Sequence, residues 1–311
     1  MTYGEMIIDK LITDFDNNRF SIAFLPYKYA MWDSMETVYD AAVKRGLTTH
    51  LMPIPYKTRG DGVWHDETTL FGENTKNRKL LKEYVPDVVV IHYPYDGRNR
   101  VTEIDPDFYS DRLKALGCKI VYLAYCGSCW GEHLILQQGV KNADYIFVAS
   151  DDEKKRFIDL WRQKGVDISK NVFCVGGLPK YEAVLKQRMY PVQIDKIQEN
   201  IVLICGSLQS FLNERDKRIA KWRETIKKHA EKENTFVMFR PHPLIEDTIR
   251  AMLPEYLFVY EYFLKEIKEI CYVDKSQGFQ ENISFANYLI SDPSSVIEVW
   301  KHTGKPFEII E

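Results

Sequence analysis

The sequence predicts an α/β protein of two Rossmann-like domains in tandem, whose parallel sheets face an interdomain ligand cleft. Short apolar runs alternate with helical stretches along the whole chain, as expected when helices cover parallel strands. The 311 residues exceed the size of one typical hydrophobic core. A proline and several polar residues interrupt the alternation at 187–200, so we place the domains at 1–190 and 191–311.

Apolar runs and helical periodicity give the expected elements of the first half. Strands are expected at 20–28, 50–55, 87–93, 119–125, 145–150 and 172–177, and helices at 35–46, 108–116, 152–164 and 180–187. Asp33 or Ser34 is a suitable N-cap for the first of these helices, and Gly46 suits its C-terminal end. Residues 57–79 are polar and lack periodicity, which predicts a long surface loop.

The second half repeats the same alternation. Strands are expected at 201–207, 235–240, 271–274, 287–292 and 306–310, and helices at 216–232, 244–252, 256–269 and 294–304. Ligands of such folds gather at the carboxyl ends of the strands. Motifs at strand ends are therefore the first candidates for function.

The composition is that of an ordinary soluble globular protein, with 45% hydrophobic and 28% charged residues. A net charge of -3 gives no overall attraction to nucleic acid or to an anionic membrane, so a phosphate site must be local. No apolar run approaches the roughly 20 residues of a membrane span, and no secretory leader is recognisable. We expect a cytoplasmic protein with reduced cysteines and at most peripheral contact with the inner membrane face.

The motif Arg240-Pro241-His242-Pro243 follows a predicted strand. Each proline fixes its own φ at about -65° and restricts the residue before it, so His242 has little backbone freedom. An imidazole beside a guanidinium can donate hydrogen bonds to phosphate oxygens. A histidine packed in a turn, with Arg240 in a surface ion pair, is the commoner arrangement for a lone histidine. The strand-end position and a second motif favour phosphate binding here.

That second motif is "SDPSS", residues 291–295, between a predicted strand and a predicted helix. Ser294 and Ser295 would lie at the helix N-terminus, where free N–H groups and the helix dipole favour an anion, although either serine could simply be an N-cap. Asp292 would repel a phosphate and is expected to face a ribose or an acceptor hydroxyl. The turn at Gly206 and Ser207, with Gln209 nearby, is a third of this kind.

Together these motifs resemble the CDP-glycerol glycerophosphotransferase family of teichoic-acid-type polymerases and primases. The resemblance is carried by "RPHP", "SDPSSVIEVWKHTGKP", "FLPYKYAMWDSMETVYDAA" and "VVVIHYPYDGRNRVTEIDPDFYSDRLK", and it extends from Ile22 to Pro306. It implies the GT-B fold and transfer of glycerol phosphate from a CDP-linked donor to a hydroxyl acceptor, with release of CMP. The acceptor would be part of a cell-wall or surface polymer, in some cases lipid-linked.

The same resemblance implies roles for single residues. Arg240 and His242 would hold the diphosphate of the donor, and Ser294 and Ser295 would contact its phosphate or ribose. Members of the family carry a Trp-His-Gly whose histidine is the proposed general base, but the matching loop here reads Tyr125-Cys126-Gly127-Ser128. His92, His133 and Asp33 are the alternatives for a base, and His92 is preferred because it ends a strand.

Other features of the sequence have weaker implications. The pair Asp151-Asp152 is better explained as a helix cap than as a Mg²⁺ site, so no metal or cofactor is expected. GT-B enzymes commonly end in a helix that crosses back to the first domain, whereas this chain stops at Glu311 after a predicted strand, so truncation and loss of that helix are both open. A glycosyltransferase with a nucleotide-sugar donor and a non-catalytic nucleotide-binding protein are the alternative functions.

Overall fold

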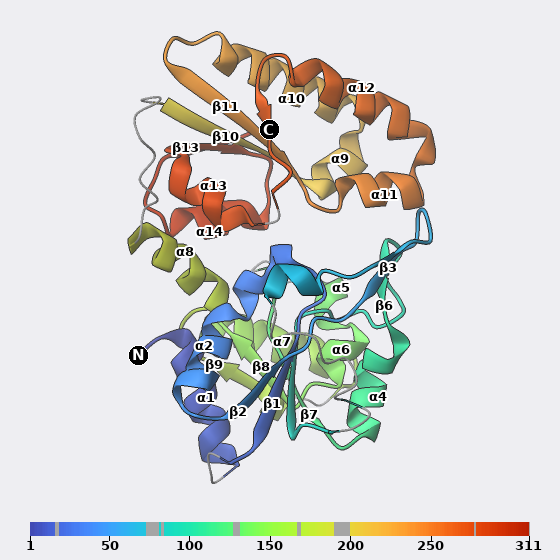
Figure 1. Ribbon diagram of the computed structural model, residues 1–311, viewed down its shortest axis with the longest axis vertical. Helices are drawn as coiled ribbons and strands as arrows, with labels where there is room; N and C mark the ends of the chain where they lie inside the picture. The colour runs from blue at the N-terminus through green and yellow to red at the C-terminus, as the bar shows by residue number, and fades with distance from the viewer. Residues whose placement is uncertain are drawn as a thin grey trace. The chain divides into compact units, whose positions relative to one another are not determined.

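The computed structural model describes residues 1–15, 19–72, 81, 84–126, 131–166, 169–189, 200–276 and 278–310. The chain folds into two compact units (Figure 1). Met1–Thr58 and Gly62–Ala183 form the N-terminal unit, and Arg59–Asp61 and Val184–Glu311 form the C-terminal unit. Of the predicted linker, residues 187–189 end a helix and residues 190–199 lie outside the described part of the chain.

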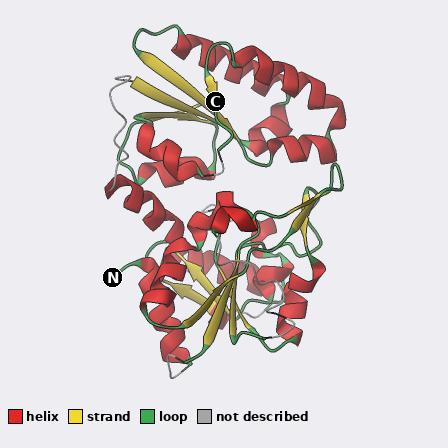
Figure 2. Cartoon of the chain, viewed as in Figure 1, coloured by secondary structure: helices red, strands yellow, loops and turns green. Residues whose placement is uncertain are grey.

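The N-terminal unit alternates strands and helices, as its sequence predicts (Figure 2). Its strands are β1 (Ser21–Leu25), β2 (Thr48–Leu51), β3 (Tyr56–Thr58), β4 (Trp64–His65), β5 (Val88–Ile91), β6 (Thr102–Ile104), β7 (Lys119–Tyr122), β8 (Tyr145–Val148) and β9 (Val172–Cys174). Its α-helices are α1 (Tyr3–Asp14), α2 (Glu36–Lys44), α4 (Ser110–Ala115), α5 (Glu132–Ile135), α6 (Gln138–Lys141), α7 (Asp151–Gln163) and α8 (Pro179–Met189), which continues into the C-terminal unit. Short 3-10 helices are η1 (Tyr29–Ser34), η2 (Thr68–Phe71), η4 (Pro106–Phe108) and η5 (Ser169–Asn171).

The main sheet of the N-terminal unit is parallel, with the strand order β2-β1-β5-β7-β8-β9. Its central strands are buried on both faces, which explains why they read as continuous apolar runs. Helices α1 and α2 pack against it through a shared apolar core that includes Leu11, Val38 and Phe24. The strand order changes direction between β1 and β5, so the turns after these two strands flank the position where doubly wound sheets open.

Helix α1 was not predicted, although the sequence carries its signal. Thr2 accepts a hydrogen bond from the Glu5 N–H at 3.0 Å, and the Glu5 side chain accepts one from the Thr2 N–H, which is a complete capping box. Ile7, Ile8 and Leu11 then fill the core from one face of the helix. The spacing Thr-x-x-Glu before these residues would have located the helix.

Two expectations for the first half are corrected by the structure. The polar segment 57–79 is not one loop, because β3 and β4 pair antiparallel and β3 also pairs with β6 in a small second sheet; residues 73–79 lie outside the described residues. Neither Asp33 nor Ser34 caps α2, which starts after Met35 without a side-chain cap. Ser34 instead donates to the Met31 carbonyl oxygen within η1, and Asp33 pairs with Lys180 of α8. The expected end of α2 is confirmed, since Gly46 has a φ of 73°.

The C-terminal unit contains one five-stranded sheet and its helices. Its strands are β10 (Asn200–Gly206), β11 (Thr235–Pro241), β12 (Tyr272–Val273), β13 (Tyr288–Ser291) and β14 (Phe307–Ile309). Its helices are α9 (Leu208–Glu214), α10 (Asp216–Ala230), α11 (Ile245–Met252), η6 (Pro254–Tyr256), α12 (Leu257–Ile267), α13 (Phe279–Phe285) and α14 (Ser295–Lys301). Helices α9 and α13 are the additions to the predicted elements.

All strands of this sheet are parallel, in the order β12-β11-β10-β13-β14, which is the Rossmann order. Helices α9 to α12 pack on one face through a core that includes Trp222, Phe239 and Phe263, while α13 and α14 lie on the other face (Figure 1). The prediction of an α/β protein with two parallel Rossmann-like sheets is confirmed. The change of direction falls between β10 and β13.

Helix length and composition also bear on membrane contact. In the described part of the chain, no helix combines the length and the apolar character that crossing a bilayer requires.

The end of β10 makes a testable prediction about packing. A Cβ atom on Gly206 would lie 2.8 Å from Cζ2 of Trp222, whose ring is fully buried and cannot move aside. We expect Gly206→Ala to lower the free energy of unfolding by about 1–3 kcal/mol through overpacking, measured by urea titration with tryptophan fluorescence. A Cβ atom on Gly278 would meet nothing within 4 Å, so Gly278→Ala should change stability by less than about 0.5 kcal/mol. Equal effects of the two substitutions would contradict this explanation.

Candidate functional site

The carboxyl edge of the C-terminal sheet brings the three predicted strand-end turns together. Strands β11, β10 and β13 are neighbours, and parallel strands end at the same edge of their sheet. The turns that follow them begin with His242, Ser207 and Asp292. These side chains are the starting points of the candidate site.

His242 is fixed by its own turn. The Leu244 N–H donates to its Nδ1 at 3.1 Å, and the Ile245 N–H donates to its carbonyl oxygen at 2.9 Å. A ring nitrogen that accepts carries no proton, so Nε2 carries the proton of the neutral ring and is a hydrogen-bond donor. The side chain is half-buried, and the prolines on either side of it in the chain restrict its backbone.

Arg240 is buried behind His242 and paired with an acid. Its side chain is 6% exposed, and its Nη1 donates to a carboxylate oxygen of Asp274 and to Ser276 Oγ at 3.0 Å. Burial opposes ionisation of Asp274, but the Ser276 N–H and the guanidinium together lower the pKa of Asp274 below its ordinary value. Much of the charge that Arg240 would offer a diphosphate is therefore neutralised inside the protein.

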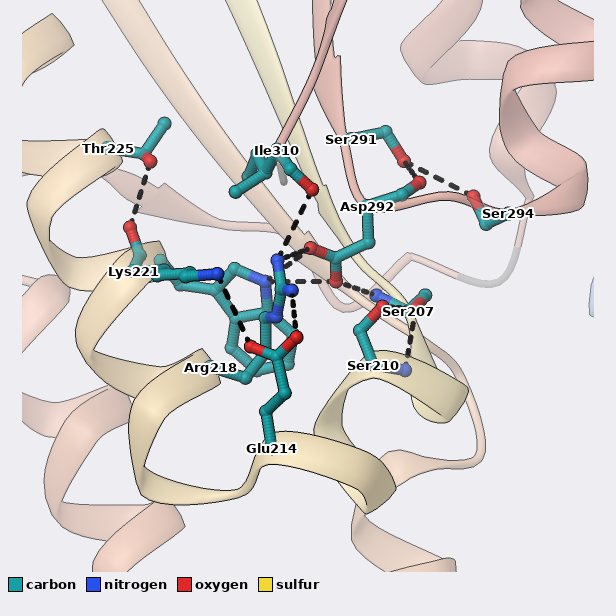
Figure 3. A network of polar contacts seen from close by, with 11 residues as sticks. Ser207, Ser210, Glu214, Arg218, Lys221, Thr225, Ser291, Asp292, Ser294 and Ile310 are labelled. Carbon is teal, nitrogen blue, oxygen red and sulfur yellow. Dashed lines mark hydrogen bonds and ion pairs between the residues drawn. The ribbon is translucent and has the colours of Figure 1, made fainter.

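Asp292 is the centre of a buried network that joins two strand ends (Figure 3). Its side chain is completely buried, and Oδ2 accepts the Ser207 N–H at 2.7 Å. Oδ1 accepts from Nη1 of Arg218 at 2.7 Å, and the indole N–H of Trp222 reaches Oδ2 at 3.1 Å. The same Arg218 Nη1 lies 3.4 Å from the carbonyl oxygen of Ile310, just after β14.

The expectation that Asp292 contacts the donor is therefore corrected. Its carboxylate is enclosed by donors from the protein and has no exposed surface, so it orders the turns rather than facing a ligand. Burial raises the pKa of Asp292, and the Ser207 N–H and Arg218 oppose that shift. Sequence reasoning missed Arg218, although a charged residue on the apolar face that holds Ile219 and Trp222 is a signal of a buried pair.

The turn after β10 is a helix start. Ser207 caps α9 by accepting the Ser210 N–H at 3.1 Å, and its own hydroxyl donates to Ser210 Oγ at 2.8 Å. Gln209 is exposed and donates to Asn213 Oδ1 at 2.9 Å along the same helix. Ser207 thus fixes the turn, and Gln209 is occupied by its own helix.

The turn after β13 leaves the start of α14 without a side-chain cap. Ser294 occupies the N-cap position but makes no capping bond, and its Oγ lies 3.2 Å from Ser291 Oγ (Figure 3). Ser295 is the first residue of the helix and is partly exposed. Ser294 therefore makes no capping hydrogen bond, although the sequence left open that a serine here is merely an N-cap.

In the N-terminal unit, His92 cannot act as the expected base. It is fully buried, its Nε2 accepts the Tyr27 N–H at 3.2 Å, and its Nδ1 lies 3.0 Å from Ser34 Oγ. The Ser34 hydroxyl donates to the Met31 carbonyl oxygen at 2.7 Å, so it accepts from Nδ1–H and both ring nitrogens are occupied. Burial lowers the pKa of His92 to about 3. Strand ends do bring residues to the edge, but this side chain turns inward.

The other two candidate bases differ in exposure. Asp33 is 6% exposed, and its Oδ2 pairs with Lys180 Nζ at 2.7 Å. Its Oδ1 is buried and accepts no hydrogen bond from the residues that the structure describes. His133 is exposed on α5, and Gly127 and Ser128 of the departing loop lie outside the described residues. Lys180 was not singled out in the sequence, which carries no signal for so distant a pair.

The expected Asp151-Asp152 cap is replaced by Ser150, which accepts the Glu153 N–H at 3.2 Å; the two aspartates follow in the first turn of α7. Within the described ranges, no group of three or more histidine, cysteine, aspartate or glutamate side chains is arranged to hold a metal ion.

Comparisons with known proteins bear on the fold. No protein-family model matches the sequence, and no curated protein does. The structure resembles the UDP-GlcNAc 2-epimerase of Methanocaldococcus jannaschii, solved with UDP-GlcNAc and UDP, with a TM-score of 0.62 and 13% identity over 93% of this chain and 83% of that chain.

Two further solved structures are similar. S. aureus MnaA bound to UDP has a TM-score of 0.61 and 12% identity over 94% of this chain and 79% of that one. The UDP-GlcNAc 2-epimerase of Neisseria meningitidis bound to UDP-GlcNAc has a TM-score of 0.60 and 12% identity over 94% of this chain and 82% of that chain. The wall teichoic acid polymerase TagF has a TM-score of only 0.48, which is too low to support a conclusion. At these identities the likeness shows the fold alone, which is of the GT-B type.

The buried network predicts a large cost for altering Asp292. We expect Asp292→Asn to lower the free energy of unfolding by about 3 kcal/mol, because Arg218 would remain buried without its counter-charge. Urea titration measures this value. Glu266→Gln is the matched control, since its ion pair with Arg223 is about 30% exposed on both sides and should contribute less than about 1 kcal/mol. Similar losses in both variants would contradict a special role for Asp292.

The buried His92 predicts a pH dependence of stability. Its pKa is about 3 in the folded protein and about 6.5 in the unfolded chain. Between these values only the unfolded chain binds the proton, so stability falls as the pH falls. Between pH 6.5 and pH 5, proton uptake at His92 in the unfolded chain lowers the free energy of unfolding by about 2 kcal/mol. Urea titration at both pH values measures this change. His92→Gln should be less stable but lose about 2 kcal/mol less over that range, whereas His133→Gln should retain the wild-type slope.

Proposed function

We propose that this protein is a GT-B transferase that moves glycerol phosphate, or a related polyol phosphate, from a CDP-linked donor to an acceptor hydroxyl in surface-polymer synthesis. Its fold supports an enzyme that uses a nucleotide-linked substrate, because the solved structures it resembles include complexes with UDP and UDP-GlcNAc. The sequence motifs support the CDP-linked polyol. The observation that carries the proposal is the fixed imidazole of His242, whose Nε2–H is a donor at the carboxyl edge of the C-terminal sheet.

In the proposed reaction, the acceptor oxygen forms a bond to the β-phosphorus of the donor. The bond between that phosphorus and the oxygen that bridges to CMP breaks, and CMP leaves with the electron pair. Negative charge grows on the bridging oxygen, and Nε2–H of His242 stabilises it. Ser294 and Ser295 would supply neutral hydrogen-bond donors to the remaining phosphate oxygens. The turn at Gly206 and Ser207 would hold the neighbouring strand end in place, because the N–H and the hydroxyl of Ser207 already donate to Asp292 and Ser210.

The proton of the acceptor hydroxyl needs a base other than His92. Asp33 is enclosed too, because its Oδ2 pairs with Lys180 and its Oδ1 is buried, so we propose that water accepts this proton. Arg240 would contribute residual positive charge from behind His242. We propose that the reaction proceeds without a metal ion, in the cytoplasm, with peripheral membrane contact where the acceptor is lipid-linked.

A second candidate function is favoured by the structural comparisons. An enzyme that acts on a UDP-linked sugar would use the same fold, and two UDP-GlcNAc 2-epimerases resemble the protein over 93% and 94% of its length. Incubation with CDP-glycerol, CDP-ribitol and UDP-GlcNAc, followed by analysis of nucleotide products, separates the two. Release of CMP supports the transferase, and conversion of UDP-GlcNAc supports the second candidate. Tight CDP binding without turnover of any donor would indicate a non-catalytic nucleotide-binding protein.

The role of His242 is tested by a substitution that retains the turn. In His242→Asn the side-chain oxygen can still accept the Leu244 N–H, but no group replaces Nε2–H. We expect kcat with CDP-glycerol to fall by roughly 10²–10³, the usual effect of removing one donor to developing charge. Initial rates of CMP release measure this change.

The control is His302→Asn, because His302 is an exposed histidine in the same unit. It should turn over at the wild-type rate. Wild-type turnover by His242→Asn would refute the proposed contact between this imidazole and the donor.

A further inference from the structure

Helix α12 presents two aromatic side chains to solvent on the face that points away from the sheet. Its inner face packs into the core of the C-terminal unit through Tyr260, Phe263 and Ile267, which are fully buried. On the outer face, Phe258 is 77% exposed and Tyr262 is 60% exposed. Figure 1 shows α12 along the outside of this unit, beside α10. Two adjacent large rings in water, unlike a single one, indicate an interaction surface.

The two rings belong to a line of side chains with a charge at each end. Residues three or four apart lie on the same face of a helix. The members of this line, which we call the α12 stripe, are Glu255 in η6 and then Phe258, Tyr262 and Lys265 in α12, and all four are exposed. Neither Glu255 nor Lys265 forms an ion pair with any residue of the described ranges. Both charges therefore remain for a partner.

The order of the residues makes the α12 stripe complementary to itself. Residue 260 is the midpoint between Phe258 and Tyr262, and it is also the midpoint between Glu255 and Lys265. If two copies of the helix pack antiparallel about a two-fold axis at this point, Phe258 of each copy lies opposite Tyr262 of the other. Glu255 then lies opposite Lys265 at both ends. A parallel arrangement would instead place like charges opposite each other.

We propose that the α12 stripe is the interface of a symmetric dimer, and that its partner is a second copy of this chain. An aromatic side chain can bury about 200 Å². At their present exposure the four rings of two copies would bury on the order of 550 Å². Small specific interfaces bury about 1,200 Å² in total, so the rings supply nearly half of that area. The dimer should therefore be weak and should form only as the protein concentration rises.

The charges around the rings favour a second copy over a membrane. Three exposed glutamates and two exposed lysines lie along this part of the chain, namely Glu255, Glu261, Glu269, Lys265 and Lys268. A surface with more acidic than basic side chains is repelled by anionic lipid. The same mixture of signs suits a partner that carries the same mixture in the reverse order, which is what an antiparallel second copy presents.

Sedimentation equilibrium of the full chain from about 1 to 500 µM tests this proposal. We expect reversible dimerisation with a dissociation constant on the order of 10–100 µM. Phe258→Glu places two charges at the centre of the interface and should raise that constant at least about thirtyfold, as the loss of an interface anchor does. Val43→Glu is the matched control, because Val43 is a 52% exposed apolar residue of α2. It should retain the wild-type constant, and both variants should keep the wild-type circular dichroism spectrum.

An exchange of charges tests the antiparallel register. Glu255→Lys alone and Lys265→Glu alone each place like charges opposite each other at both ends of the dimer. Each should therefore raise the dissociation constant at least about fivefold. In an equimolar mixture of the two variants, every lysine at these positions can lie opposite a glutamate. The mixture should form a mixed dimer with about the wild-type constant.

The proposal would be overturned by a wild type that stays monomeric over the whole concentration range, or by a dimer that Phe258→Glu does not weaken. A mixture of the charge variants that associates no better than either variant alone would overturn the antiparallel arrangement. If the wild type stays monomeric but sediments with phosphatidylglycerol vesicles, and Phe258→Glu does not, the partner of the α12 stripe is a membrane and the dimer is wrong.

Discussion

In each unit, a hydrogen bond between the turns after two neighbouring strands fixes how the strand ends meet, and the candidate site depends on this bond. In the C-terminal unit Asp292 accepts the Ser207 N–H at 2.7 Å, and in the N-terminal unit His92 accepts the Tyr27 N–H at 3.2 Å. Both bonds join the two strands between which the strand order changes direction, where doubly wound sheets open towards a ligand. A side chain in this position holds the turns in place, and it is then not available to a substrate.

The two units make the same connection with different chemistry. An ionised carboxylate needs compensation in a dry interior, and Asp292 has it from Arg218 and Trp222. A neutral imidazole needs no counter-ion, and burial keeps His92 neutral by lowering its pKa to about 3. The C-terminal connection therefore contains a buried ion pair that also reaches Ile310 beyond β14, whereas the N-terminal one consists of neutral hydrogen bonds.

Charge compensation also shapes what the C-terminal edge can offer to a phosphate. The two buried arginines at this edge, Arg218 and Arg240, are paired with Asp292 and Asp274. This pairing neutralises much of the charge of these two arginines. Neutral donors, namely the Nε2–H of His242, the serine hydroxyls and the backbone N–H groups, are the groups suited to bind an anion there. Such donors are effective when their geometry is fixed in advance, as it is for an imidazole between two prolines.

The strands and most helices were predictable because apolar periodicity, capping residues and glycine C-caps are local signals. The exceptions have two different reasons: the capping box at Thr2 went unused, and the pairing of β3 with β6 joins segments between which β4 and β5 intervene. The positions of His242 and Ser207 at strand ends were also predictable. The roles of His92 and Asp292 were not, since a strand end shows where the backbone goes and not which way a side chain turns.

The sequence by itself determined the α/β class, the two parallel sheets and the set of residues that reach their carboxyl edges, because these follow from patterns within a few residues. Only the tertiary structure decided which of those side chains are enclosed and which can meet a ligand. The partners that enclose them are remote in the chain: Ser207 and Asp292 are 85 residues apart, and Tyr27 and His92 are 65 apart. Burial depends on such contacts, and no local pattern records them.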